Sequence, residues 1–481
     1  MKSLYIRAIL AAAIFSTLAL FGMATSANAA DNKPNIVFIV ADDLGWKDVG
    51  FHGSDIKTPN IDQLAATGAR LEQFYAQPMC TPTRAALMTG RYPLRYGLQT
   101  AIIPAPSTYG LPTDEWLLPQ ALKEAGYQTA IIGKWHLGHA DKKFWPRQRG
   151  FDYHYGPLIG EIDYFTHKEH DTVDWYRDNK VVKEKGYSTT LLGNDAVKLI
   201  NQHDPGTPLY LYLTFNAPHT PYQATPEYLD QYKHIADPSR RAYAGAITAM
   251  DDQIGRVLAA LDSKKMRDNT LIVFMSDNGG THNAMFAGSI TDMSKVVIPC
   301  DNGPYRGGKG DLYEGGTRVV SLANWPGHIK AGSTVDQIIH VVDWYPTLAG
   351  LAGGKTGKAK PLDGLNVWPT ISAGKPSPRT EVVYNVEPFR AGIRQGDWKL
   401  IWRTLLPASV ELYNIAQDPS EKNNVAAQHP DKVAALQQRA NELAASMAKP
   451  MLLETEIKAM MQRIKMPPSL PAELDSLDEE R

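Results

Sequence analysis

The 481-residue chain contains only two cysteines, Cys80 and Cys300. So few cysteines exclude a fold stabilised by a disulfide framework, which is typical of small secreted proteins. One bridge between the two remains a possible arrangement. The chain also lacks any Asn-x-Ser/Thr sequence, the acceptor for N-glycosylation. The missing acceptor favours a bacterial source.

The chain has no excess of charge of either sign, with 50 Lys and Arg against 51 Asp and Glu. Binding to the phosphate backbone of nucleic acids needs clustered positive charge, so we expect no nucleic-acid partner. Beyond residue 30 there is also no run of about 20 apolar residues, the length that spans a bilayer. A hydrophobic content of 43% still suits a large globular core.

Residues 1–30 have the pattern of a secretory signal peptide. Lys2 and Arg7 form a basic start, residues 8–24 are mostly apolar, and Ala-Asn-Ala at 27–29 is a small-residue cleavage signal. We therefore expect an exported protein, periplasmic or extracellular, with no membrane attachment after cleavage. The alternative is an N-terminal membrane anchor.

Short apolar runs alternate with amphipathic segments along most of the chain. The runs that indicate buried strands are 35–40, 128–132, 209–215 and 270–275. The segments that indicate helices are 60–67, 114–125 and 240–261. This alternation predicts an α/β domain over residues 31–379, with a large, mainly parallel sheet between layers of helices.

Polar residues follow the four expected strands directly. They are Asp42 and Asp43, Lys134 and His136, His219, and Asp277 and Asn278. Any one group could belong to a turn or a helix cap. In open α/β sheets, however, sites form at the carboxyl ends of the strands, and four such groups together favour a shared site there.

The chain changes character near residue 380. Short strand patterns occur at 382–386, 392–394, 398–402 and 411–414, and an amphipathic helix is expected at 432–447. We predict a smaller α+β subdomain over residues 380–466 with a short antiparallel sheet, reached through a proline-rich connection. The acidic segment 467–481 is expected to be a mobile tail.

Cys80 begins the sequence Cys-Thr-Pro-Thr-Arg, which ends at Arg84 and is followed by Thr-Gly-Arg at 89–91. Proline is common in the first turn of a helix, and the helix dipole favours negative charge there. From these residues alone, Cys80 could be a reactive thiolate, a metal ligand or half of a disulfide.

The motif resembles that of the type I, formylglycine-dependent sulfatases, whose hallmark is Cys-x-Pro-x-Arg followed by Thr-Gly-Arg. The resemblance covers nearly the whole mature chain. It is closest to the arylsulfatase B (N-acetylgalactosamine 4-sulfatase) branch, through segments 150–164, 187–189, 212–221 and 306–318. It implies an alkaline-phosphatase-like fold. Thr83 departs from the family, which usually has Ser or Ala at this position.

The resemblance implies one Ca²⁺ per chain and conversion of Cys80 to formylglycine by a maturation enzyme. The implied metal ligands are Asp42, Asp43, Cys80, Asp277 and Asn278. Carboxylate and amide oxygens suit a hard divalent cation. The implied catalytic residues are Cys80, Arg84, Lys134, His136, His219 and Lys309.

The resemblance also implies a mechanism. The basic side chains hold the sulfate, and hydrated formylglycine forms a covalent formylglycine-sulfate intermediate. His219 or Lys309 protonates the leaving alcohol, and His136 accepts the proton that releases sulfate. Taken singly, Lys134 and Lys309 could each be solvated surface lysines.

The resulting hypothesis is a sulfatase that hydrolyses sulfate esters, with a sulfated carbohydrate as substrate. Residues 150–178 combine Tyr, His, Asp and Glu with Trp175, which suits either a sugar ring or an ordinary surface loop. Two other functions stay open. One is a phosphate or phosphonate ester hydrolase on the same scaffold, and the other is a non-catalytic protein that binds sulfated glycans.

Overall fold

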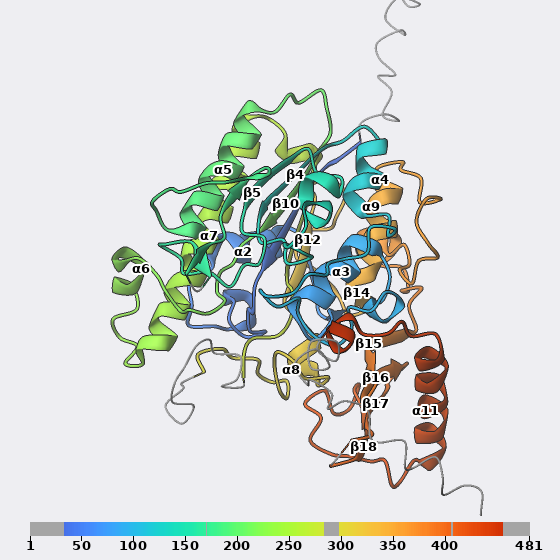
Figure 1. The fold of residues 1–481 in the computed structure, drawn as a ribbon. Coiled ribbons are helices and arrows are strands. Elements are labelled where there is room, and N and C mark those ends of the chain that lie inside the picture. Colours follow the sequence, from blue (N-terminus) through green and yellow to red (C-terminus); the bar gives the residue numbers. More distant parts are fainter. Residues whose placement is uncertain (1–32, 170, 283–297, 406, 456–481) are drawn as a thin grey trace, which may run out of the picture.

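A computed structural model of the chain describes residues 33–169, 171–282, 298–405 and 407–455 (Figure 1). The expected signal peptide and the expected C-terminal tail lie outside the described residues. Among the residues that are described, no helix combines the length and the apolar character needed to cross a membrane.

The main sheet has ten strands in the order β13-β2-β12-β11-β1-β10-β4-β5-β8-β9. Their bounds are β1 Asn35–Ala41, β2 Ala69–Leu71, β4 Gln128–Gly133, β5 Tyr153–Gly156, β8 Tyr176–Arg177, β9 Lys180–Val181, β10 Leu209–Thr214, β11 Thr270–Ser276, β12 Ser321–Asn324 and β13 Ser333–Val335. The central strands β11, β1, β10, β4 and β5 run parallel. Towards both edges, antiparallel pairs appear, so the sheet as a whole is mixed.

The four strands expected from the sequence are β1, β4, β10 and β11, and they are neighbours at the centre of the sheet. Their residues are almost all buried, because helices cover both faces. In the register, Ala41 lies beside Ser276, and Thr214 lies beside Gly133. The polar residues that follow these strands therefore emerge at one edge.

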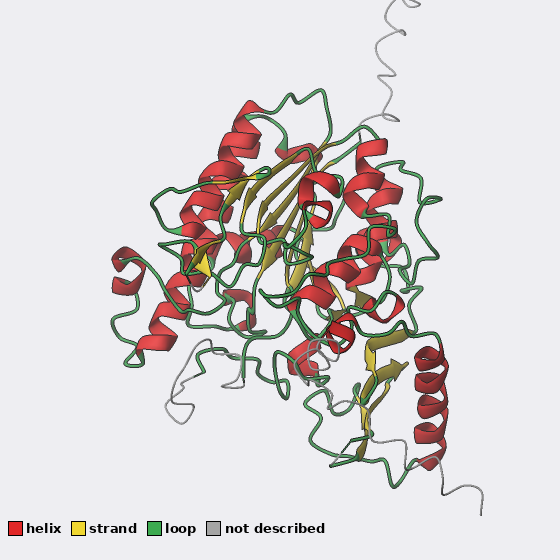
Figure 2. Ribbon diagram, in the orientation of Figure 1, coloured by secondary structure: helices red, strands yellow, loops and turns green. Residues whose placement is uncertain are grey.

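Helices cover both faces of the sheet (Figures 1 and 2). One face carries α2 Pro59–Thr67, α5 Ser188–Gln202 and α7 Pro238–Ser263, and the other carries α3 Cys80–Thr89, α4 Leu118–Glu124 and α9 Trp344–Leu351. Alternate residues of β1 enter different cores: Val37 and Ile39 face α5 and α7, whereas Ile36 and Phe38 face the other layer. This two-sided burial is what a parallel sheet requires.

The helix expected at 114–125 begins later, at Leu118. Pro119 lies in its first turn, where its fixed φ suits a helix start. The Gln120 side chain accepts a hydrogen bond of 2.9 Å from the backbone N–H of Leu117. The proline and this hydrogen bond fix the start of the helix at Leu118, whereas the apolar pattern alone predicted an earlier start.

The C-terminal part forms a four-stranded antiparallel sheet, as expected, in the order β15-β16-β17-β18. The elements are β15 Glu381–Glu387, β16 Arg390–Gln395, β17 Trp398–Arg403, β18 Ser409–Asn414 and α11 Pro430–Ala445. Leu436, Ala440 and Leu443 are the buried residues of α11, and they belong to the same core as residues of the sheet. Figure 1 shows this unit beside the end of the main domain that carries α8.

Short elements complete the description. They are β3 Phe74–Tyr75 with β14 Ile339–His340, β6 Lys168–Glu169 with β7 Thr172–Val173, and the helices α6 Pro226–Asp230, α8 Glu314–Thr317 and α10 Trp368–Ala373. Residues from β3, the start of α8 and the C-terminal sheet share a small aromatic core that includes Tyr75, Tyr313, Tyr384 and Tyr413. The C-terminal sheet is thus packed directly against the segment that leads from Lys309 into α8.

Candidate active site

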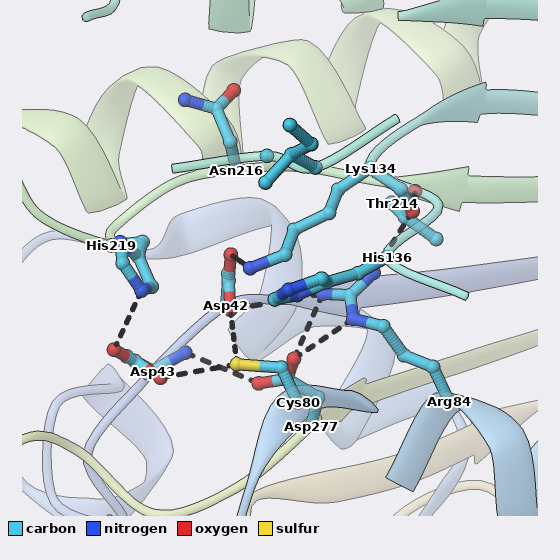
Figure 3. A network of polar contacts seen from close by, with 12 residues as sticks. Asp42, Asp43, Cys80, Arg84, Lys134, His136, Thr214, Asn216, His219 and Asp277 are labelled. Carbon is cyan, nitrogen blue, oxygen red and sulfur yellow. Dashed lines mark hydrogen bonds and ion pairs between the residues drawn. The ribbon is translucent and has the colours of Figure 1, made fainter. Parts of the chain in front are cut away.

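The polar residues after the central strands converge around Cys80, the first residue of α3 (Figure 3). The Cys80 Sγ atom lies 3.4 Å from Asp42 Oδ1 and 4.0 Å from Asp43 Oδ1. Both carboxylates follow β1, and the thiol comes from the helix layer above the sheet. All three side chains are buried. A strand end and a helix start thus bring together residues that are nearly 40 positions apart.

The Cys80 thiol itself is poorly suited to act as a nucleophile. Burial raises its pKa well above the ordinary value, and the negative charge of Asp277 raises it further. The thiol is therefore neutral near pH 7. Cys80 and Cys300 are both free, so the structure excludes the bridge that the sequence left open.

Thr83, the departure from the family motif, has a local structural role. Its hydroxyl oxygen accepts a hydrogen bond of 3.0 Å from the Gln77 N–H, and it also lies 3.0 Å from the Gln77 carbonyl, to which it donates. These contacts close the turn that precedes α3. A serine at this position has the same hydroxyl and could make the same two hydrogen bonds. The additional methyl group of Thr83 is buried.

Each of three buried carboxylates is paired with one cation. Lys134 Nζ lies 2.7 Å from Asp42 Oδ2, and Lys309 Nζ lies 2.7 Å from Asp43 Oδ2. Arg84 donates to Asp277 Oδ2 through two nitrogens, at 3.0 and 2.8 Å. This is the fork geometry that favours arginine in buried pairs.

The charges shift one another's pKa values. Burial alone would raise the pKa of Asp42, but Lys134 and the other nearby cations outweigh it and hold the pKa below its ordinary value. For Asp277 the balance is opposite: burial and the neighbouring Asp42 raise its pKa to about 7, despite Arg84. Burial and the neighbouring carboxylate thus outweigh the nearby cations at Asp277.

Lys134 and Lys309 are not surface lysines, since their exposed fractions are 0% and 4%. Glycines make room for Lys134. A Cβ on Gly133, whose φ is +116°, would lie 1.7 Å from the Thr214 carbonyl oxygen, and a Cβ on Gly160 would lie 2.4 Å from the Lys134 side chain. The Lys309 N–H donates to the Gly280 carbonyl at 3.1 Å.

The residues present fit a divalent cation. One potential ligand atom from each of Asp42, Asp43, Cys80 and His219 lies within 4.8 Å of the others. Asn278 Oδ1 is buried without a hydrogen-bond partner, while its Nδ2 donates to Asp43 Oδ1 at 2.7 Å. An unpaired amide oxygen beside clustered carboxylates is a typical ligand for a hard cation. His219, expected as a proton carrier, is the member that the expected ligand set did not contain.

The two histidines differ in their surroundings. His136 has a left-handed backbone, with φ of +59°, and neither ring nitrogen has a hydrogen-bond partner among the described residues. Burial lowers its pKa well below the ordinary value, and Lys134 lowers it further, so the ring is neutral and can accept a proton. His219 places Nδ1 2.7 Å from the Thr220 carbonyl, so Nδ1 carries the proton, and Nε2 lies 3.1 Å from Lys309 Nζ.

Two residues that the sequence did not single out support these histidines. The Thr81 hydroxyl donates to the His136 carbonyl at 2.9 Å, which ties α3 to the segment after β4. The Tyr164 hydroxyl contacts the carbonyls of Asn216 and His219, at 3.0 and 2.8 Å. Both act on backbone atoms, so no motif of reactive side chains marks them. Their only signal is a place inside segments that carry the family resemblance.

Of the two environments that the sequence left open for residues 150–178, a sugar-binding surface and an ordinary surface loop, Trp175 occupies neither. Trp175 is completely buried, its Nε1 donates to Glu184 at 2.7 Å, and its ring stacks on His167 with centroids 4.5 Å apart. The residue belongs to the core below β5 and α5 rather than to a binding surface. A cluster of aromatic and polar residues in the sequence does not distinguish these two environments.

Comparison with known families gives two matches. Residues 34–354 match the family described as Sulfatase, and residues 308–449 match the family described as N-sulphoglucosamine sulphohydrolase, C-terminal. The first match includes the whole cluster around Cys80. The second begins just before Lys309 and extends through α11.

Among curated proteins, the chain is 38% identical over 400 residues to arylsulfatase J of Mus musculus, covering 80% of this chain and 64% of that protein. It is 34% identical over 386 residues to N-acetylgalactosamine-6-sulfatase of Homo sapiens, covering 76% of this chain and 71% of that protein. The chain thus spans about two thirds of the length of these relatives. The arylsulfatase B branch stays a prediction.

Among solved structures, the fold is similar to that of Ps i-CgsB in complex with k-i-k-neocarrahexaose. The TM-score is 0.78 and the sequence identity is 35%, with 87% of this chain and 94% of that chain covered. The architecture expected from the sequence, a sheet between helix layers with a small C-terminal sheet, is confirmed.

Proposed function

Because the chain belongs to the sulfatase family, we propose that it hydrolyses sulfate esters of a sulfated glycan, with a formylglycine made from Cys80 as the nucleophile. The observation that carries this proposal is the convergence of Arg84, Lys134, Lys309 and two histidines on a buried residue whose encoded thiol is neutral. The basic side chains and histidines surround position 80 as they would a nucleophile, but a neutral thiol is a poor nucleophile. The reactive group at position 80 must therefore be something other than the encoded thiol.

The charge balance supports an anionic substrate. Asp42, Asp43 and Asp277 are matched one-to-one by three cations, so the cluster is close to neutral by itself. These carboxylates, Asn278 and the residue at position 80 would hold a divalent ion, for which we propose Ca²⁺. When bound, such an ion polarises sulfate oxygens and neutralises negative charge. The resulting positive excess of about two charges suits the binding of a sulfate ester.

The side chains have distinct roles in this proposal. A hydrated formylglycine would place its hydroxyl oxygens near the position of Cys80 Sγ, from which one of them attacks the sulfur of the sulfate ester. Arg84 and Lys134 hold the sulfate oxygens. The contact between His219 and Lys309 forms the proton donor for the leaving alcohol. Burial lowers the pKa of Lys309, but the nearby negative charges, with Asp43 first among them, together outweigh burial and raise it well above the ordinary value, so Lys309 is protonated. Neutral His136 accepts the proton during the release of sulfate.

The glycan part of the proposal comes from the relatives. One is named for a sulfated amino sugar, and a similar structure was solved with a carrageenan hexasaccharide. The likeness to the arylsulfatase B branch suggests a 4-sulfated galactosamine or galactose unit. The pattern of residues 1–30 further suggests export to the periplasm or the extracellular space of a bacterium, and a formylglycine-generating enzyme is the implied partner.

Paired substrates test the reaction. Conversion of the thiol to formylglycine lowers the intact mass by about 18 Da, and purified protein is first checked for this loss. The converted protein is then assayed with an aryl sulfate and with the matching aryl phosphate. We expect faster turnover of the sulfate and dependence on calcium. Preference for the phosphate would favour a phosphate ester hydrolase, and binding of sulfated glycans without turnover would favour a non-catalytic protein.

A panel of desalted sulfated oligosaccharides tests the substrate class. We expect release of inorganic sulfate from at least one glycan. Turnover of aryl esters with no glycan cleaved would contradict the carbohydrate assignment and leave the sulfatase reaction intact.

A further inference from the structure

The C-terminal sheet carries a hollow of about 680 Å³ that the proposed reaction does not use. It lies between the turn that joins β15 to β16, the facing ends of β17 and β18, and the segment before α8. Six of the residues that line it are Tyr313, Glu387, Phe389, Arg390, Arg403 and Glu411. We call this set the C-terminal hollow.

The C-terminal hollow exposes apolar side chains. Phe389 is 47% exposed, and Leu405, which also lines the hollow, is 55% exposed. They are two of only five large apolar residues that are exposed in the described part of the chain. Exposed apolar side chains that gather in a concave region are typical of a binding surface.

Ordered polar groups surround Phe389. The Tyr313 hydroxyl contacts both oxygens of Glu411, at 3.0 and 2.8 Å, and Arg403 donates to the same carboxylate at 2.5 Å. Arg390 is paired with Glu387. These contacts hold donors and acceptors in place before any ligand binds. An apolar ring beside fixed hydrogen-bonding groups matches a sugar, which has apolar C–H faces and a rim of hydroxyl groups.

Charge further favours an anionic sugar. Arg306 lies over the Tyr313 ring, with its guanidinium carbon 3.9 Å from the centroid. Together with Arg390 and Arg403 it gives three positive charges against the two carboxylates Glu387 and Glu411. The net charge near the hollow is therefore positive, which suits a sulfated chain.

A hydrogen bond links the C-terminal hollow to the segment that carries Lys309. Arg390 Nη1 donates to the Gly310 carbonyl at 2.8 Å, and Gly310 directly follows Lys309. Tyr313 is four residues after Lys309, so their Cα atoms are at most about 14 Å apart. One short segment thus contributes Lys309 to the reaction centre and Tyr313 to the hollow.

From these observations we infer that the C-terminal hollow binds a further sugar unit of the same glycan chain whose sulfate ester lies at residue 80. Phe389 stacks against the sugar ring, and the arginines contact its hydroxyl or sulfate groups. The inference rests on the proposed function, because it assumes that the substrate is an oligosaccharide rather than a small ester.

The test compares substrates of different length in one variant series. Wild type, Phe389→Ala and Phe389→Trp are assayed with 4-nitrophenyl sulfate and with hexasaccharides and disaccharides of ι-carrageenan and chondroitin sulfate. Phe389→Ala should lower kcat/KM roughly tenfold for a hexasaccharide, mainly through KM. It should leave the aryl ester and the disaccharide within twofold, and Phe389→Trp should retain the wild-type value.

A matched control is Leu365→Ala, which removes another exposed apolar side chain (39% exposed) outside the hollow. Leu365→Ala should leave kcat/KM unchanged for every substrate. Thermal unfolding should show that all variants are folded. Equal effects of Phe389→Ala on short and long substrates, or no effect on either, would overturn the inference. So would a wild type that turns over the aryl ester but neither binds nor hydrolyses any oligosaccharide. Failure of wild type on the aryl ester itself would instead contradict the proposed function.

Discussion

Lys134 and Asp42 form an ion pair of 2.7 Å in which both side chains are completely buried. Breaking a buried pair by removing one partner leaves an uncompensated charge and costs about 3–5 kcal/mol. We therefore expect Lys134→Met to lower the free energy of unfolding by that amount in a chelating buffer. Turnover should fall by a factor on the order of 10²–10³, the usual effect of removing one group that stabilises developing charge.

The contrasting pair is Lys143 with Asp141, 3.1 Å apart and about half exposed on both sides. Lys143→Met should leave turnover unchanged and should change the free energy of unfolding much less than Lys134→Met does, because solvent screens an exposed pair. Chemical unfolding and steady-state kinetics of both variants provide the comparison. Similar stability losses in the two would show that burial of Lys134 carries no special cost.

Calcium should stabilise the folded protein. A ligand that binds only the folded state adds about 2.7 kcal/mol when its concentration is 100 times Kd. We expect the melting temperature to rise with calcium and to fall on chelation. Asn278→Ala, which removes a buried oxygen without a partner, should need more calcium for the same rise.

Asn302 offers the matched control, since its Oδ1 and Nδ2 are both bonded to Gly280. Asn302→Ala should lower stability at every calcium concentration without shifting the midpoint of the calcium titration. A wild-type melting temperature that is independent of divalent cations would argue against the metal site.

The state of residue 80 should determine activity. Because burial keeps the Cys80 thiol neutral, protein with unmodified Cys80 should show no multiple turnover and should react slowly with iodoacetamide. Cys80→Ser should fold, bind calcium and remain inactive over many turnovers. Intact mass and initial rate, measured on preparations with different degrees of conversion, should rise together. Full activity in unconverted protein or in Cys80→Ser would contradict the formylglycine mechanism.

Much of this arrangement could be predicted from the sequence because strand ends and reactive residues coincide. The apolar run ending before Asp42 and the run ending before Asp277 both predict a strand, and a parallel pairing puts the two carboxylates at one edge. The structure shows this placement. The catalytic and ligand roles of the residues stay predictions for the experiments above.

Other features depended on three-dimensional packing that local patterns do not encode. Trp175 has the same sequence neighbourhood whether it binds a sugar or fills a core, and only the position of His167 and Glu184 decides. Thr81 acts on a backbone carbonyl from a distant segment, so its contribution follows from the fold. The antiparallel edges of the sheet likewise arise from strands of only two to four residues, too short for a clear periodic pattern.

A second buried cluster predicts how stability depends on pH. Lys399 Nζ lies 2.9 Å from Glu314 Oε1 and 2.9 Å from Glu421 Oε1, and all three side chains are inaccessible to solvent. Burial raises the pKa of both carboxyls, but Lys399, Arg318 and Arg394 together outweigh burial at Glu314 and hold its pKa at about 2. At Glu421 burial prevails over Lys399, and the pKa is about 7. One ammonium group therefore neutralises only one of the two carboxyls fully.

The sign of the effect follows from proton binding. Between pH 4.5 and 7 the folded state keeps a proton on Glu421 that the unfolded state has lost, so the free energy of unfolding falls as pH rises through this window. The loss is up to about 3 kcal/mol, at about 1.4 kcal/mol per pKa unit. The contribution of Glu314 is lost only below pH 4.5, outside this range. Glu421→Gln mimics the protonated group, so it should remove the contribution of Glu421 to this decline. Urea unfolding of wild type and Glu421→Gln at pH 5, 6, 7 and 8, both in saturating calcium, should give curves that diverge as pH rises. Parallel pH profiles would show that Glu421 is ionised throughout and that Lys399 neutralises both carboxyls.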